Sequence, residues 1–203
     1  MSGSLFIVAA PSGAGKTSLV NALVDKQPDI QLSVSHTTRT KREGEVEAKD
    51  YFFISQDEFA QMRKKEMFLE SATVFDHFYG TSSEAVLTQL KQGHDVILEI
   101  DWQGAQQVRQ NYPESLSIFI LPPSKRALAQ RLQGRGQDSE TVIARRMQDA
   151  ENELSHYAEF DYIVVNDDFD VALQNITSII FSRRHAFHVQ KETQAGLLAE
   201  LLA

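Results

Sequence analysis

The chain has 203 residues, with 42% hydrophobic residues, 24% charged residues and a net charge of −8. This length allows one well-buried core or at most two small domains, and the composition is that of an ordinary globular enzyme. The acidic balance disfavours nucleic acid as a partner, so a bound anion would need a local cluster of cations. The absence of cysteine excludes disulfides and thiolate metal sites and fits a reducing compartment.

The first four residues lead directly into a short apolar stretch, without the basic region and longer apolar run of a secretion signal. No apolar run approaches the roughly 20 residues that a membrane span needs. We therefore expect a cytoplasmic protein with no membrane partner, and the sequence leaves a homo-oligomer open.

The first predicted elements are a buried strand over residues 5–9, a glycine-rich turn, and a helix that Pro28 ends. The turn and the start of the helix comprise Ala10, Pro11, Ser12, Gly13, Ala14, Gly15, Lys16 and Thr17. Glycines let backbone N–H groups approach an anion, and the helix start adds partial positive charge. The pattern is that of a phosphate-binding loop, except that Ala10 stands where the motif has glycine. In such a loop Lys16 would contact phosphates and Thr17 would ligate magnesium.

A short strand is predicted over residues 31–35, followed by a polar, aperiodic segment over 36–45. Arg39, Lys41 and Arg42 place three cations within four residues there. Composition alone leaves two interpretations open. The segment is either a solvated loop or an anion-binding site in which two guanidinium groups hold a phosphate.

Shorter elements are predicted after this loop. Residues 50–54 form a strand, and Ser55 with Glu58 makes a capping box that starts a helix to about Lys65. Residues 68–75 are predicted to be extended, and Glu70 interrupts their apolar pattern. A carboxylate there is unfavourable unless it is paired or exposed.

A turn is predicted at Tyr79-Gly80-Thr81, and Thr81 with Glu84 starts a helix that ends at Gly93. Residues 95–101 then form an apolar strand that ends in Glu99 and Asp101. Two residues apart, these carboxylates would share one face, beyond the carboxyl end of a parallel strand, where ligands bind. The alternative is an edge strand with a solvated face.

The next elements are a helix over 102–111, a strand over 117–121 and a helix over 124–132. Glycines at 134 and 136 break the pattern before a longer helix over 139–157. Four arginines surround the break: Arg131, Arg135, Arg145 and Arg146. They form either a second phosphate-facing element on a mobile lid or an ordinary helix surface.

A last strand is predicted over 162–165, then a helix over 169–187 and an amphipathic tail helix to 203. Strands that alternate with helices predict a doubly wound parallel α/β fold. Residues 37–94 hold denser short strands and predict an insertion with its own small sheet.

Taken together, these residues resemble guanylate kinases, in the bacterial form of the nucleoside monophosphate kinase group. The resemblance covers nearly all of residues 3–185. It rests on Ala-Pro-Ser-Gly-Ala-Gly-Lys-Thr, Ser33 to Arg39, Gly44-Glu45 with Asp50-Tyr51, Tyr79-Gly80-Thr81, Ile100 to Gly104, Arg131 to Gly136 and Val165 to Asp168.

The resemblance implies a division of the chain and a reaction. The phosphate-loop core would comprise residues 1–36, 95–125 and 160–185, with a mixed α/β GMP-binding insertion over 37–94, a helical lid and its following helix over 126–158, and a tail over 186–203. The implied reaction is ATP + GMP → ADP + GDP, with Mg²⁺ as cofactor.

The resemblance also implies roles for individual residues. The GMP site would comprise Ser35, Arg39, Arg42, Glu45, Tyr51, Glu70, Tyr79, Gly80, Thr81 and Asp101. The ATP site would comprise residues 10–17 with Arg131, Arg135 and Asn166. The residues closest to catalysis would be Lys16, Arg39, Arg135 and Arg146. Thr17 would bind Mg²⁺ with ATP, and Glu99, which replaces an aspartate common in the family, would do so through water.

The chemistry of guanine agrees with these assignments. Its N1–H and amino group are adjacent donors for one carboxylate, as Glu70 would supply, and its O6 can accept from a hydroxyl such as Thr81. Adenine reverses both roles. Two rivals remain: a kinase of another monophosphate such as AMP, and a non-catalytic scaffold that binds phosphopeptides. A GTP-hydrolysing switch lacks support because no Asn-Lys-x-Asp run is present.

Overall fold

The computed structural model describes residues 3–74, 76–133 and 140–203. Its centre is a five-stranded parallel sheet with the order β2-β7-β1-β8-β9. The strands are β1 (Leu5–Ala9), β2 (Ile30–Leu32), β7 (Asp95–Glu99), β8 (Leu116–Leu121) and β9 (Tyr162–Val165). The predicted doubly wound α/β fold is therefore confirmed.

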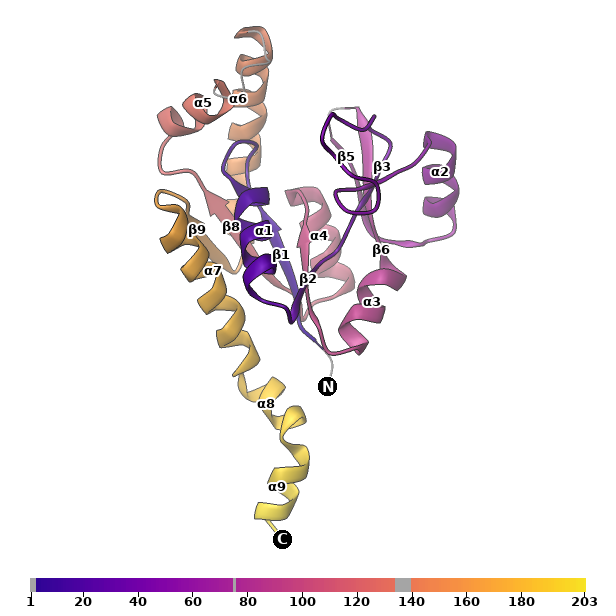
Figure 1. The fold of residues 1–203 in the computed structure, drawn as a ribbon, viewed down its shortest axis with the longest axis vertical. Helices are drawn as coiled ribbons and strands as arrows, with labels where there is room; N and C mark the ends of the chain where they lie inside the picture. Colours follow the sequence, from indigo (N-terminus) through magenta and orange to yellow (C-terminus); the bar gives the residue numbers. More distant parts are fainter. Residues whose placement is uncertain (1–2, 75, 134–139) are drawn as a thin grey trace.

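Helices cover both faces of this sheet because β1 is apolar on both sides. Phe6 and Val8 pack in one cluster with α1 (Lys16–Lys26) and α7 (Phe169–Arg184). Leu5 and Ile7 pack in the opposite cluster with α3 (Ser83–Lys91) and α4 (Trp102–Asn111). The alternation along one strand thus fixes the two helical layers (Figure 1).

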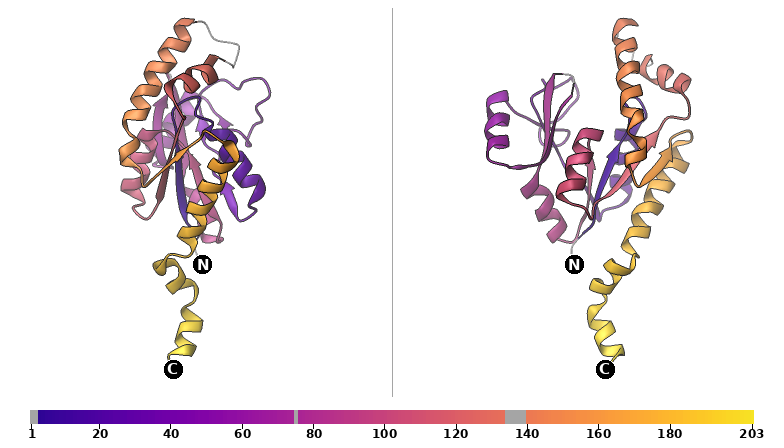
Figure 2. Two further views of the ribbon diagram at one scale, coloured as in Figure 1. Left: turned by 90° about the vertical axis from the view of Figure 1, so that its left-hand side faces the viewer. Right: turned by 180° about the vertical axis from the view of Figure 1, so that it is seen from behind.

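A second sheet of four strands lies beside the first, with the order β4-β3-β6-β5. Its elements are β3 (His36–Thr37), β4 (Phe52–Phe53), β5 (Phe68–Val74), β6 (His77–Ser82) and the covering helix α2 (Gln56–Lys64). Phe59 of α2 stacks on Phe68 and Phe78 of the sheet. Figures 1 and 2 show this small sheet and α2 on the side of the molecule remote from α7.

The remaining helices lie at the two ends of the molecule. Helices α5 (Lys125–Gln133) and α6 (Glu140–Ser155) lie above the carboxyl ends of the central strands (Figure 1). Helices α8 (Phe187–Thr193) and α9 (Ala195–Leu201) continue from α7 away from the body, with exposed apolar side chains such as Phe187. Within the residues described, no helix combines the length and apolar character needed to cross a membrane.

The predicted turn at Tyr79-Gly80-Thr81 is wrong, because these residues lie inside β6 and pair with β5. Gly80 serves packing there: a Cβ would lie 2.9 Å from the Phe68 ring. The cap of α3 is consequently Ser82, which accepts from the Ala85 N–H, and not Thr81.

Other predicted boundaries also shift. The expected strands over 31–35 and 50–54 shorten to β2 and β4, and the tail forms two helices instead of one. β7 ends at Glu99, so Asp101 belongs to the cap of α4, where its carboxylate accepts from the Gly104 N–H at 2.8 Å. The capping box of Ser55 and Glu58 is confirmed.

Candidate active site

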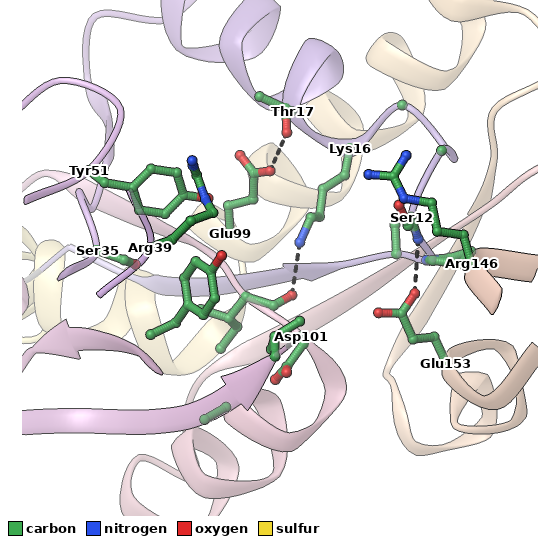
Figure 3. Close-up of a pocket in the computed structure, with 18 of the residues that line it drawn as sticks. Ser12, Lys16, Thr17, Ser35, Arg39, Tyr51, Glu99, Asp101, Arg146 and Glu153 are labelled. Carbon is green, nitrogen blue, oxygen red and sulfur yellow. Dashed lines mark hydrogen bonds between the residues drawn. The ribbon is translucent and has the colours of Figure 1, made fainter. Parts of the chain in front are cut away.

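A pocket of about 290 Å³ opens at the carboxyl ends of β1 and β7, between the glycine-rich loop and the four-stranded sheet (Figure 3). Residues of the predicted phosphate-binding loop and the two arginines of the predicted cationic segment line the same cavity. Its wall includes Ala10, Pro11, Ser12, Gly13, Gly15, Lys16, Thr17, Ser35, Arg39, Arg42, Tyr51, Glu70, Tyr79, Glu99, Asp101, Arg146 and Glu153. Four parts of the chain therefore meet here: the loop after β1, the end of β7, the small sheet with its loops, and α6.

The glycine-rich loop turns into α1 without a side-chain cap. Gly15 holds the cap position with a φ of 91°, a conformation that L side chains rarely adopt. The first backbone N–H groups of α1 consequently lack an intrahelical partner, as at every helix start. These free N–H groups can bind an anion even where no positively charged side chain is present.

The loop is held from behind by groups outside the pocket wall. Asn166 follows β9, is only 5% exposed, and donates its amide to the Ala14 carbonyl at 2.7 Å. Arg131 of α5 donates to the same carbonyl at 3.4 Å and to the Asn166 carbonyl at 2.9 Å. Both residues were predicted at an ATP site, and the structure places them behind the loop.

Lys16 and Thr17 at the start of α1 extend toward β7. The Lys16 ammonium donates to the Ile100 carbonyl at 3.1 Å, and the Thr17 hydroxyl donates to Glu99 at 2.5 Å (Figure 3). Within the described residues, no group of three or more histidines and carboxylates could hold a metal ion. A hydroxyl beside one carboxylate fits Mg²⁺, which takes few protein ligands and completes its shell with water and substrate phosphates.

On the opposite side, Arg39 is fixed by a two-point ion pair with Glu45. Their nitrogen–oxygen distances are 2.6 and 3.1 Å, and Glu45 also accepts from the Arg42 backbone N–H at 2.7 Å. The Arg39 guanidinium lowers the pKa of the Glu45 carboxyl. Arg39 is therefore held in one place, as the anion-binding interpretation requires, while Arg42 is exposed to solvent.

Two tyrosines complete this wall. The rings of Tyr51 and Tyr79 make an edge-to-face contact with centroids 5.9 Å apart, and Arg39 lies 5.5 Å from the Tyr51 centroid. Burial raises the pKa of Tyr51 to about 12. The phenol consequently keeps its proton at neutral pH and can donate a hydrogen bond to an anion.

Glu70 lies at the inner end of the pocket and is only 4% exposed. Its carboxylate accepts from the Thr81 hydroxyl at 2.6 Å, and Thr81 in turn lies 3.2 Å from the Ser35 hydroxyl. Burial raises the pKa of Glu70 to about 7. A carboxylate has about four lone-pair sites, so Glu70 can accept hydrogen bonds from a ligand in addition to that from Thr81.

Helix α6 contributes two side chains, Arg146 and Glu153 (Figure 3). Glu153 accepts from the Ser12 N–H at 2.9 Å, and burial raises its pKa. Sequence reasoning missed Glu153 because no local signal links it to a loop 141 residues earlier. The predicted Arg135 lies outside the described residues. Arg145 is exposed and is not among the described residues that line the pocket.

Three predicted GMP-site residues lie behind the wall and not in it. Glu45 holds Arg39, and Thr81 holds Glu70, as described above. Gly80 is buried beneath Phe59 and Phe68 and packs the sheet that carries Tyr79.

Comparison with known proteins agrees over nearly the whole chain. The guanylate kinase family model matches residues 2–183. Guanylate kinase of Escherichia coli strain K12 is 57% identical over 203 residues, covering 99% of this chain and 98% of that protein. The Salmonella typhi guanylate kinase is 56% identical with the same coverage.

A solved structure shows the same fold. The crystal structure of guanylate kinase from Anaplasma phagocytophilum superposes with a TM-score of 0.78 and 31% identity, covering 92% of this chain and 88% of that one. On these grounds the chain belongs to the guanylate kinase family.

Proposed function

We propose that this enzyme transfers the γ-phosphoryl group of ATP to GMP, giving ADP and GDP, in purine nucleotide metabolism. The observation that carries this proposal is one cavity lined by both a phosphate loop and an arginine–tyrosine cluster beside a buried carboxylate. Two phosphate-bearing ligands can face each other there. Family membership supports the same reaction.

We assign the acceptor to the four-stranded sheet. Arg39 and Arg42, with Ser35, Tyr51 and Tyr79, surround a space suited to the GMP phosphate. Glu70 would accept from guanine N1–H and the amino group together, and Asp101 lies on the same wall. AMP would leave Glu70 unpaired, which disfavours it by roughly 10⁴-fold in a site built on such bonds.

We assign the donor to the loop after β1. Backbone N–H groups of residues 13 and 15–17 and the Lys16 ammonium would hold the ATP phosphates, with Arg146 of α6 on the facing side. Mg²⁺ supplies charge neutralisation on those phosphates when bound, and Thr17 and Glu99 are the groups of this chain that would hold it.

The protein then needs mainly to position the two reactants. A GMP phosphate oxygen is already a nucleophile, so no general base is required. Lys16 and the arginines offset charge on the moving phosphoryl group, while Arg39 keeps the acceptor phosphate in line. Exclusion of water between α6 and the small sheet would suppress ATP hydrolysis.

The direct test is ADP formation from ATP and Mg²⁺ with GMP, AMP, CMP, UMP or no acceptor. We expect turnover with GMP and little with the others. Glu70→Ala should erode the preference for GMP over AMP. Equal turnover with AMP in the unmodified enzyme, or ADP formation that ignores the acceptor, would overturn the proposal.

A further inference from the structure

Helix α4 makes unusual contacts with β5, the strand that carries Glu70. β5 lies at the edge of the four-stranded sheet, so within the described chain its outer side has no strand partner. Gln107 of α4 fills that place: its amide accepts from the Ser71 N–H at 3.0 Å and donates to the Ser71 carbonyl at 2.9 Å. Asn111 donates to the Leu69 carbonyl at 3.2 Å. The backbone is therefore held on both sides of Glu70.

A third residue on the same face of α4 approaches Glu70 itself. A Cβ on Gly104 would lie 2.6 Å from Oε2 of Glu70 and 3.2 Å from its Cδ. The carboxylate has little room to retreat, because its other oxygen accepts from Thr81 at 2.6 Å. Because glycine has no side chain, Gly104 provides the space that the Glu70 carboxylate occupies.

The adjacent face of α4 is fixed to the central sheet. Ala105 and Val108 are fully buried in the core cluster that contains Leu5 and Ile7. Gly104, Gln107 and Asn111 are three and four residues apart, the spacing of one helix face. One rigid helix thus spans from the phosphate-loop core to the buried carboxylate.

We propose that Gly104 and Gln107 are specificity-positioning residues, which set the place of the Glu70 carboxylate so that it accepts from both guanine donors. The inference rests on the proposed function, because it concerns how the same pocket selects its base. Two parallel hydrogen bonds demand more accurate placement than one. Displacement of Glu70 should therefore weaken GMP more than inosine monophosphate, which has N1–H but lacks the amino group.

The experiment measures kcat/KM for GMP and for inosine monophosphate, with KM for ATP as an internal reference. Gln107→Ala should lower the GMP-to-inosine monophosphate ratio about five- to tenfold, the worth of roughly one hydrogen bond, while KM for ATP stays unchanged. Gly104→Ala should lower the ratio at least as far. Gln107→Glu, which keeps the acceptor for the Ser71 N–H, should fall between Gln107→Ala and the unmodified enzyme.

Gln106→Ala is the matched control. It removes the same side chain one position earlier, where the amide donates to Glu159 at 2.9 Å and not to β5. Its ratio should equal that of the unmodified enzyme. Thermal melting of each variant identifies any that fails to fold. If Gln107→Ala fails to fold, Gly104→Ala and Gln107→Glu carry the test; if Gly104→Ala fails, Gln107→Ala and Gln107→Glu do.

Each outcome has a distinct meaning. If the unmodified enzyme does not use GMP, the proposed function itself fails. If it uses GMP but folded Gln107→Ala and Gly104→Ala keep the unmodified ratio, only the positioning inference is wrong. Equal losses with both monophosphates, or a parallel rise in KM for ATP, would show a general structural role and would also overturn it.

Discussion

The phosphate loop and the arginine cluster face each other across one pocket, and they present positive potential in different ways (Figure 3). The loop relies on backbone groups, two positive-φ glycines and one ammonium. The cluster relies on side chains that are themselves held, as Arg39 is held by Glu45 and flanked by Tyr51.

The two sides of the pocket should therefore differ in which substitutions impair their binding of phosphate. A site of backbone amides should tolerate most changes of side chain but not a change that alters its turn. A site of guanidinium groups should depend on residues one step removed from the ligand, because those residues fix the geometry. Four predictions would break or sharpen this comparison.

The largest effect is expected from Lys16→Ala, which removes the one side-chain cation at the start of α1. Its loss should lower kcat by about 10³-fold, because charge on the transferring group is no longer offset. GMP binding, measured by calorimetry without ATP, should stay nearly unchanged. Parallel loss of GMP affinity would show that the two halves are not independent.

Gly15→Ala should damage the donor half next most strongly. The new Cβ would lie 2.5 Å from the Asn166 amide nitrogen, at a φ where L residues are strained by roughly 1–2 kcal/mol. We expect KM for ATP to rise at least about tenfold through strain and a displaced Asn166.

Gly44→Ala is the control for Gly15→Ala, since Gly44 has a φ of 85° but nothing within 4 Å of a new Cβ. It adds the same kind of strain without touching the phosphate loop, so KM for ATP should not change. If both variants raise KM for ATP equally, backbone strain anywhere in the chain would explain the loss.

Glu45→Gln tests the side-chain half. It removes the charge that pairs with Arg39, and a charge-assisted bond is worth roughly 1.5–3 kcal/mol, so KM for GMP should rise about tenfold or more. Glu47→Gln is the control, because Glu47 accepts from the Phe53 N–H and, among the described residues, makes no ion pair with Arg39. A normal KM for GMP in Glu45→Gln would mean that Arg39 needs no support.

The smallest effect concerns stability without nucleotide. Burial raises the Glu70 pKa from 4.5 to about 7, so the folded protein binds this proton more tightly than the unfolded chain. The free energy of unfolding should therefore fall as pH rises from about 4.5 to about 7, by at most about 3 kcal/mol. Urea unfolding at pH 5 and pH 8 measures this loss.

Glu70→Gln should remove that part of the pH dependence, because the amide does not titrate in this range. The difference in unfolding free energy between pH 5 and pH 8 should thus be smaller in the variant. Identical differences in both proteins would show that Glu70 does not titrate as its burial requires.

The sequence was sufficient for features that depend on local spacing. The run from Leu5 to Thr17 predicts strand, loop and helix because each step follows within a few residues. The capping box of α2 is local in the same sense. The arginine cluster could be predicted only in part. Composition left a solvated loop open, and the structure adds the contact between Arg39 and Glu45, which holds one of the arginines in place.

Features that depend on distant partners could not be predicted in this way. The sequence around Gly80 indicates a turn. Glycine is needed there, however, because β5 brings the Phe68 ring against this position and leaves no room for a Cβ. Glu153 gave no signal, because the Ser12 N–H that it binds comes from another region of the chain. The place of Asn166 behind the loop likewise follows from the neighbouring β8–β9 pairing.

The contact between α4 and β5 also bears on self-association in concentrated solution. Free N–H and C=O groups along an edge strand are a template to which another polypeptide can add as a new strand. Such pairing is the first step toward amyloid-like aggregates. Here Gln107 and Asn111 occupy those groups at Ser71 and Leu69. The helix that orients the base-selecting acid thereby also protects this edge strand from intermolecular β-pairing.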